Sequence, residues 1–163
     1  MLRRLASEAD LPRIVEIYNA TIPSRMVTAD TQPVTTEARL PWFREHRPDF
    51  RPLWVVEESD KVIAWLSFSA FYGRPAYNKT AELSLYVDEA CRRRRIGHNL
   101  LRDAIVHSPN IGVDTLLGFI FAHNLPSLAL FRAFGFEQWA YLPQVARLDA
   151  DDRDLVILGR RVR

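Results

Sequence analysis

The sequence is short of cysteine and lysine and has no long apolar run. Its 163 residues include one cysteine, Cys91, and among its 22 cationic residues only Lys61 and Lys79 are lysine. A lone cysteine excludes an intramolecular disulfide and favours a reducing compartment. The N-terminus lacks the apolar core of a signal peptide, and no apolar run reaches the roughly 18–20 residues of a membrane-spanning helix. We therefore expect a cytoplasmic protein without a membrane partner.

Modest net charge and length limit the function classes further. The formal net charge is +2, so the protein as a whole is not a polyanion binder, and any phosphate site must come from local charge. With 48% hydrophobic residues the chain can bury one core but not comfortably two, and we expect a single domain over residues 1–163. Three of the four histidines, His98, His107 and His123, have no metal-ligand spacing. The histidine spacing therefore predicts no metal site. Cys91 has no evident base partner, so we expect no nucleophilic cysteine.

Periodic apolar patterns predict alternating strands and helices. Ser7 and Asp10 stand at capping-box spacing before the first helix, and Pro41 predicts a kink or restart in the second. Asn124 is expected to cap the last helix. The predicted strands cover residues 1–5, 53–57, 61–69, 80–87, 115–121, 137–147 and 153–161, and the predicted helices cover 7–19, a segment from Thr35 that carries Trp42 and Phe43, a segment from Ile96 through Ile105, and 124–135.

The segment TAELSLYV, residues 80–87, alternates between apolar and polar positions. Its odd-numbered residues face one side, and Glu82, Ser84 and Tyr86 face the other. A helix and the continuous apolar run TLLGFIF, residues 115–121, follow. Strand, helix and strand at this spacing imply a crossover, so the two strands should be parallel. The sequence thus predicts an α/β (α+β) fold with a mixed sheet.

Four consecutive arginines, Arg92 to Arg95, precede an Ile-Gly pair that opens the next helix. Helix N-terminal N–H groups and guanidinium groups favour an anion, and Gly97 would allow a phosphate to approach closely. On these residues alone, phosphate binding and a solvated loop are equally open. A nucleic-acid site is a third reading, but Asp88, Glu89 and Asp103 flank the run and oppose it, so we expect no nucleic-acid partner.

Several longer blocks, in this order, resemble one family: SRMVTADTQPVT, FYGRPAYNKTAELSLYVDEACR, IFAHNLPSLALF, FGFEQW, LPQVARLD and RDLVILG. They resemble the GNAT superfamily of N-acetyltransferases, and within it the phosphinothricin-acetyltransferase-like enzymes. The resemblance covers nearly the whole chain. It implies acetyl transfer from acetyl-CoA to the primary amine of a small amino-acid analogue, such as phosphinothricin, methionine sulfoximine or methionine sulfone, by direct attack in a ternary complex. It also implies a mostly antiparallel sheet that splays between two central parallel strands, about four flanking helices, and a homodimer.

In that superfamily the pyrophosphate loop reads Q/R-x-x-G-x-G/A, which aligns with Arg92 to Gly97. Gly97 fits the pattern, whereas Arg95 replaces the first glycine. If residue 95 needs a positive φ, arginine there costs about 1 kcal/mol or more. The resemblance also places the pantetheine arm on the backbone of the 80–87 strand, where pairing to an open strand edge is a reasonable physical basis. The cofactor-binding residues so implied are Leu85, Tyr86, Val87, Arg92, Arg93, Arg94, Arg95, Ile96, Gly97, His98, Asn124 and Ser127.

The resemblance implies Glu82 as the base that takes the acceptor's ammonium proton, directly or through one water. On the residues alone, a cross-strand ion pair is the simpler role for this carboxylate. Arg74 and Tyr77 are implied as substrate residues, because a guanidinium fork suits the carboxylate of an amino-acid-like acceptor. A roof over the site is expected from Arg25, Met26 and Val27.

The proton for the leaving thiolate has no evident donor. Many members of the superfamily place a tyrosine where this chain has Phe131. Water, or another hydroxyl such as that of Tyr141, would then have to act. Together with Arg95, this leaves one alternative function open, an acetyl-CoA-binding protein with lost or different acceptor activity.

Overall fold

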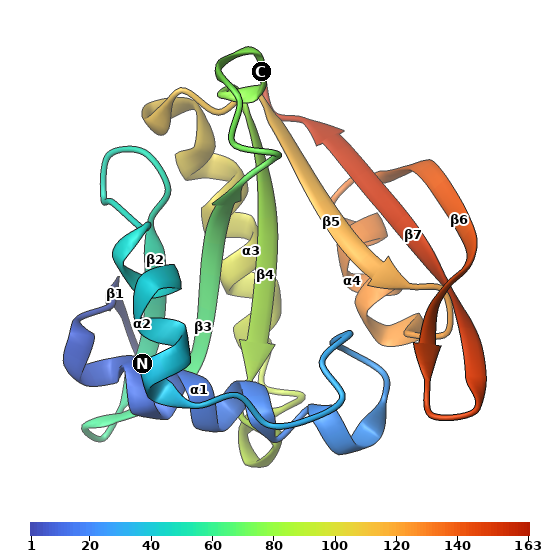
Figure 1. Cartoon of the computed structure of the whole chain (residues 1–163). Helices are drawn as coiled ribbons and strands as arrows, with labels where there is room; N and C mark the ends of the chain where they lie inside the picture. The colour runs from blue at the N-terminus through green and yellow to red at the C-terminus, as the bar shows by residue number, and fades with distance from the viewer.

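The computed structural model describes all 163 residues, and its sheet has seven strands in the order β1-β2-β3-β4-β5-β7-β6 (Figure 1). Every neighbouring pair is antiparallel except β4 and β5, which are parallel as predicted. The strands are β1 (Leu2–Leu5), β2 (Leu53–Glu58), β3 (Lys61–Ala70), β4 (Thr80–Val87), β5 (Thr115–Phe121), β6 (Glu137–Leu148) and β7 (Asp151–Arg161), and the helices are α1 (Leu11–Asn19), α2 (Thr36–Arg44), α3 (Ile96–His107) and α4 (Leu125–Ala133).

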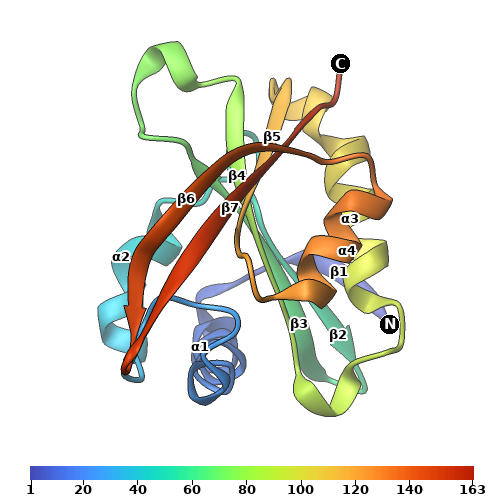
Figure 2. The same cartoon turned by 90° about the vertical axis from the view of Figure 1, so that its right-hand side faces the viewer.

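Helices cover both faces of the sheet, with α1 and α2 on one face and α3 and α4 on the other (Figures 1 and 2). The larger apolar cluster has 21 buried residues and packs α3 and α4 against the strands. The smaller one has 8, including Ile14, Val55 and Trp65, and lies under α1. Burying a large apolar side chain is worth roughly 1.5–3 kcal/mol, so these two clusters hold both helical layers on the sheet. No helix of the structure combines the length and apolar character needed to cross a membrane.

Local sequence sets where the helices begin. Ser7 and Asp10 form the predicted capping box, but the first turn is a 3-10 turn, Glu8–Asp10, and the α-helix begins at Leu11. The predicted restart at Pro41 is wrong, because α2 continues through that proline to its end. Proline removes one N–H donor, and α2 tolerates this because it has no buried residue, so water can satisfy the freed carbonyl.

The parallel pair β4–β5 stays together only at its beginning. The paired positions are Thr80–Thr115, Ala81–Leu116 and Glu82–Leu117, and the strands then diverge. Beyond this point β4 continues on β3, whereas β5 remains paired with β7 along its whole length. Figure 1 shows the sheet opening between β4 and β5, with the start of α3 beside the open end. The predicted splayed α/β architecture is therefore confirmed.

Candidate active site

Three cross-strand pairs of side chains line the face of β3 and β4 that α1 and α2 cover. Their register is Trp65–Tyr86, Ser67–Ser84 and Ser69–Glu82. The Trp65 and Tyr86 rings stack with centroids 4.4 Å apart, and the Trp65 indole donates to the carbonyl of Ile14 at 3.1 Å. The face therefore runs from an aromatic row through a row of hydroxyls to a carboxylate.

Glu82 occupies the last paired position before β4 leaves β5. Its carboxylate is half-buried, and it forms no ion pair or hydrogen bond with another side chain. The cross-strand ion pair that the residues alone allowed is therefore absent. Burial raises the pKa of Glu82 above the usual carboxyl range. A carboxylate that is unpaired and more basic than usual suits proton abstraction.

Divergence of the strands leaves backbone groups of β4 without a sheet partner. Asp88 donates its N–H to the carbonyl of Ile63 on β3. Because hydrogen-bonding direction alternates along a strand, Tyr86 also directs its backbone groups to β3, whereas Leu85 and Val87 direct theirs toward β5. Of the three β4 residues predicted to contact the cofactor, only Leu85 and Val87 therefore have backbone groups without a sheet partner. The Tyr86 ring lies on the face of the sheet that α1 and α2 cover.

The loop before α3 presents a run of free backbone donors. The N–H groups from Arg93 through His98 form no hydrogen bond within the protein. Arg93 and Arg95 both adopt left-handed backbone conformations, with φ of 62° and 59°. The alternation of left-handed and ordinary residues turns successive N–H groups toward one side, as in anion-binding nests. The conformation that normally selects glycine is therefore present at residue 95.

The four arginine side chains differ in their partners. Arg94 donates to both carboxylate oxygens of Glu58, at 2.7 and 2.9 Å, and Arg92 lies 3.6 Å from Glu89. Arg93 and Arg95 are exposed and form no ion pair. Two of the four charges are thus paired with carboxylates. This pairing leaves Arg93 and Arg95 as the guanidinium groups available to an anion.

Gly97 and Asn124 lie on the two helices beside the opening. A Cβ at Gly97 would stand 3.4 Å from Leu85 and 3.6 Å from Leu130 on α4. The side chain of Asn124 caps α4 as predicted, accepting from the N–H of Ser127 at 3.3 Å. The Asn124 side-chain amide makes no other hydrogen bond, so its N–H groups are free for a ligand.

The predicted substrate residues fall into two groups at opposite ends of β4 (Figure 1). Arg74 and Tyr77 are exposed on the loop that precedes the strand. Buried Arg51 holds this loop by donating to the carbonyls of Asn78 and Thr80, at 2.8 and 3.1 Å. The loop between α1 and α2, which carries the predicted roof, lies near the other end. Within a single chain, the two groups of predicted substrate residues therefore lie apart.

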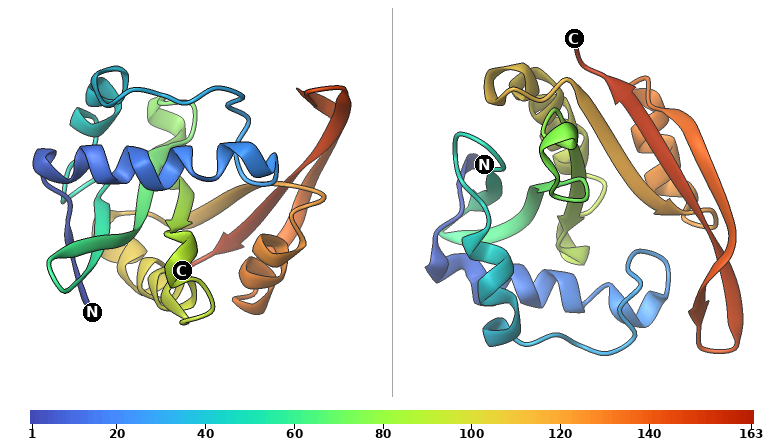
Figure 3. Two further views of the ribbon diagram at one scale, coloured as in Figure 1. Left: turned by 90° about the horizontal axis from the view of Figure 1, so that it is seen from below. Right: turned by 45° about the horizontal axis from the view of Figure 1, so that its top comes forward.

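Arg25 joins the α1–α2 loop to the β6–β7 hairpin. Its guanidinium donates to Asp149 at 3.0 and 3.1 Å, and its carbonyl contacts the His123 ring at 2.9 Å. Figure 3 shows this loop extending beneath the sheet toward the hairpin. The Arg25 side chain is thus engaged with protein partners, and Met26 and Val27 are half-buried beside it. The predicted roof, residues 25–27, is therefore anchored through Arg25 to Asp149 and His123, and we call this anchored segment the strap.

Phe131 holds the position of the superfamily's tyrosine, and Tyr141, the side-chain hydroxyl considered in its place, already has a protein partner. Phe131 is buried against Gly118, where an added Cβ would stand 2.7 Å from its ring. The Tyr141 hydroxyl donates to Asp154, an exposed ion-dipole contact on β6 and β7 that raises the pKa of Tyr141. No tyrosine lies on α4. Neither of these two positions therefore supplies a free side-chain acid for the leaving group.

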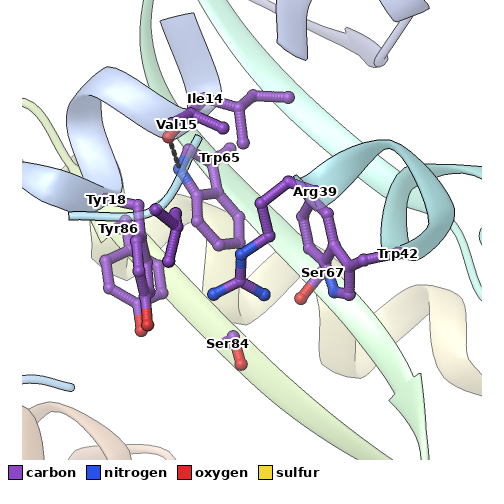
Figure 4. A pocket seen from close by; sticks show the side chains of 10 residues that line it. Ile14, Val15, Tyr18, Arg39, Trp42, Trp65, Ser67, Ser84 and Tyr86 are labelled. Atoms are coloured by element: carbon purple, nitrogen blue, oxygen red, sulfur yellow. Dashed lines mark hydrogen bonds between the residues drawn. The ribbon is translucent and has the colours of Figure 1, made fainter. Parts of the chain in front are cut away.

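Sequence reasoning missed two polar residues on the aromatic face, Arg39 and Ser67. Both line a pocket with Ser84 and Tyr86 (Figure 4). Arg39 lies on a helix without a buried face, and Ser67 lies within an apolar strand. Neither has a local signal in the sequence that separates it from an ordinary surface or core residue, because tertiary packing alone brings them together.

Comparisons with known proteins agree with this arrangement. The Acetyltransferase (GNAT) family model matches residues 12–136. YwnH of Bacillus subtilis (strain 168), which carries the provisional name phosphinothricin acetyltransferase, is 54% identical over 163 residues, 99% of each chain. The L-methionine sulfoximine/L-methionine sulfone acetyltransferase of Salmonella typhimurium is 30% identical over 145 residues, 89% of this chain and 85% of that protein. The crystal structure of a phosphinothricin acetyltransferase from Sinorhizobium meliloti in complex with acetyl-CoA matches with a TM-score of 0.91 and 27% identity, covering 98% of this chain and 87% of the other.

The family model covers more than half of the chain and the relative from Bacillus subtilis matches it over its whole length, so the chain belongs to the GNAT family of acetyltransferases. The predicted family and enzyme class are confirmed. The roles of individual site residues, the cytoplasmic location, the homodimer and the expected lack of nucleic-acid and membrane partners stay predictions.

Proposed function

We propose that this protein transfers the acetyl group of acetyl-CoA to the primary amine of a small amino-acid-like acceptor, by direct attack in a ternary complex. The observation that carries the proposal is the unpaired Glu82 carboxylate at the point where β4 leaves β5. From there the opening leads to the free donors at the start of α3. A proton acceptor and an anion-binding loop thus lie at two positions along one opening.

The residues present fit acetyl-CoA, which would supply an acyl group activated as a thioester. Free N–H groups from Arg93 to His98, with the side chains of Arg93 and Arg95, would hold the pyrophosphate. The open backbone groups of Leu85 and Val87 would pair with the amide-rich arm. Gly97 leaves space at the floor that a side chain would fill. Backbone N–H groups and only two unpaired guanidinium groups would bind the pyrophosphate and still allow CoA to dissociate after the transfer.

The chain's own residues then supply the chemistry of transfer. Glu82 takes the proton of the acceptor ammonium, which frees the nitrogen lone pair to attack the acetyl carbonyl carbon. A backbone N–H of the open β4 edge stabilises the developing oxyanion. As the C–N bond is made the C–S bond breaks, the nitrogen gives its second proton to solvent water, and solvent protonates the leaving thiolate. Burial of Tyr86 raises its pKa, so it remains a neutral hydroxyl beside the reaction.

An amino-acid-like acceptor is supported by Arg74, on the loop that precedes β4. Arg74 forms no ion pair on its exposed loop, so it is free to bind a carboxylate. The relatives' names specify phosphinothricin, methionine sulfoximine and methionine sulfone as their substrates. All three are small amino acids with a polar terminal group, and we propose this class for the acceptor here.

Release of free CoA thiol from acetyl-CoA tests the proposal. The purified protein is offered acetyl-CoA with phosphinothricin, methionine sulfoximine, methionine sulfone and common amino acids. We expect turnover with at least one of the first three, and a strongly raised KM for that acceptor in Arg74→Ala. The matched control is Arg132→Ala, an exposed arginine on α4. Calorimetric binding of acetyl-CoA without thiol release for any amine would contradict the proposal and favour a cofactor-binding protein without this activity.

A further inference from the structure

A small pocket lies between α1, α2 and the face of β3 and β4 that carries Glu82 (Figure 4). Its volume is about 140 Å³, below the roughly 300–1,000 Å³ of sites for drug-sized ligands. Most of the wall is apolar or aromatic, with Trp42, Trp65 and Tyr86 among the lining residues. Its polar groups include Arg39 and the hydroxyls of two cross-strand serines. A space of this size suits one compact group of a larger molecule.

Ser67 is a polar residue of the pocket whose hydroxyl lacks a hydrogen-bond partner within the protein. Its side chain is only 1% exposed, and its hydroxyl has no hydrogen-bond partner in the protein. Buried hydroxyls almost always have a partner, because burial without one destabilises the folded state. Ser67 lies directly across from Ser84, so the two side chains are neighbours on the same face. An oxygen-bearing group in the pocket would satisfy the orphaned hydroxyl.

Arg39 brings a positive charge with unused donors to the same pocket. Only one of its N–H groups has an acceptor, a carboxylate oxygen of Asp30 at 3.3 Å, and Asp30 also accepts from the Tyr18 hydroxyl. The guanidinium lies 4.7 Å from the Tyr18 ring centre and 5.6 Å from that of Trp42. In Figure 4 it projects among the pocket residues and away from its own helix. The aromatic rings hold the cation in place while most of its fork stays open.

The pocket is adjacent to the proposed base, because its Ser67–Ser84 pair is next to the Ser69–Glu82 pair on the same face of the sheet. Glu82 precedes Ser84 by two residues on β4, a separation of roughly 7 Å along a strand, and both side chains face the same way. This is the distance between the amino group and the end of a short amino-acid side chain. A molecule with its amine at Glu82 can therefore place its terminal group between Arg39 and the two serines.

We propose that Arg39, Ser67 and Ser84 form the subsite for the acceptor's terminal group, and that this group is compact and carries at least two hydrogen-bond acceptors on one atom, as in a phosphinate, a sulfone or a sulfoximine. This inference rests on the proposed acetyl transfer to an amino-acid-like amine. The guanidinium donates to one acceptor atom and the Ser67 hydroxyl to another, while the aromatic walls exclude water. An acceptor whose side chain ends in an alkyl group or an unoxidised thioether leaves these donors unpaired and is disfavoured.

Methionine sulfone and methionine test the subsite, because they differ only in the two sulfonyl oxygens. We expect the wild-type protein to prefer the sulfone in kcat/KM. Arg39→Gln and Ser67→Ala should each lower the sulfone-to-methionine ratio by roughly tenfold or more, the effect of losing a charge-assisted or buried hydrogen bond. Arg44→Gln, an exposed arginine on the same helix, is the matched control and should keep the ratio. Unchanged ratios in both pocket variants would overturn the assignment.

Thermal unfolding separates this role from a structural one. Ser67→Ala removes an unsatisfied buried hydroxyl, so its Tm should equal or exceed that of the wild type while its preference for the sulfone falls. A lowered Tm would mean that the hydroxyl is satisfied by the protein and would contradict the inference.

Failure of acetyl transfer itself would be seen separately. If the wild type acetylates neither compound, calorimetric titration of the CoA-loaded protein with methionine sulfone decides the subsite. Weaker binding in Arg39→Gln and Ser67→Ala than in the wild type and Arg44→Gln would support it. Equal binding in all four, or no binding to the wild type, would overturn it.

Discussion

Arg95 shows how a single residue can depart from a family pattern without losing the required shape. The loop keeps the left-handed conformation at this position, with φ of 59°, although arginine replaces the usual glycine. Left-handed backbone costs a non-glycine residue roughly 1–2 kcal/mol. The loop keeps its free N–H donors. Arginine at this position lowers the stability of the folded state and adds a cation beside the proposed phosphate site.

A pair of substitutions at residue 95 isolates this cost. Arg95→Gly and Arg95→Ala lose the same charge, but only glycine accepts the left-handed conformation without strain. We expect Arg95→Gly to have a free energy of unfolding about 1 kcal/mol above that of Arg95→Ala, measured by urea denaturation. Equal values would show that the residue does not adopt this conformation in solution.

Sequence reasoning found the residues with local signals and missed those that depend on packing. Alternation in TAELSLYV predicted the side to which Glu82 points, and the Asn124 cap follows from one residue at a helix start. Ser67 lies in a strand whose neighbours are buried, and Arg39 lies on a polar helix, so both have ordinary explanations on their own. Only the packing of α2 over β3 gives them a common site.

Most elements could be predicted because each has its own pattern or cap. The divergence of β4 from β5 could be inferred only from the family resemblance. It arises because β5 is held by β7 along its length while β4 is held by β3, and neither cause is visible within either strand. The restart considered at Pro41 was wrong for a related reason. Its effect depends on whether water reaches the freed carbonyl, and α2 is exposed.

The ion pair between Arg25 and Asp149 connects the α1–α2 loop to the β6–β7 hairpin. Its role can be tested by measuring the KM for the acceptor. Arg25→Gln and Asp149→Asn should each raise the acceptor KM by about two- to five-fold, because an exposed ion pair contributes little. The double variant should resemble each single one, since the pair is lost in all three. The KM for acetyl-CoA should stay unchanged. Additive effects would mean that each residue acts separately.

Salt provides an internal control for the strap. At about 1 M salt the Debye length falls to roughly 3 Å, and an exposed pair is largely screened. The wild-type acceptor KM should then approach that of the variants. A difference that persists at high salt would contradict an electrostatic strap.

At the scale of the whole molecule, the sheet is two halves that share one short parallel contact. The half built on β3 and β4 carries the proposed base and the terminal-group pocket, and the half built on β5 and β7 carries the helix capped by Asn124. Their divergence creates the opening along which acceptor and acetyl-CoA would meet. This arrangement depends on each half keeping its own core, which the two helical layers provide.

Buried charge at Glu82 links activity to stability. Its pKa is raised by burial, so the folded state binds its proton more tightly than the unfolded state does. Stability therefore falls as pH rises from the unfolded-state pKa to the folded-state pKa, and above both the buried charge is a constant cost. Glu82→Gln should therefore raise the Tm at pH 7. Glu45→Gln, at an exposed position, is the control and should leave the Tm unchanged.

The kinetics of Glu82→Gln test the central claim most directly. With the best acceptor of the panel, we predict a kcat lower by roughly 10²- to 10⁴-fold, the usual contribution of a general base, and an unchanged affinity for acetyl-CoA. The wild-type kcat/KM should rise with pH through a midpoint above the ordinary carboxyl pKa of about 4.3, and Glu82→Gln should lack this step. A variant with wild-type kcat and the same acidic limb would contradict the account.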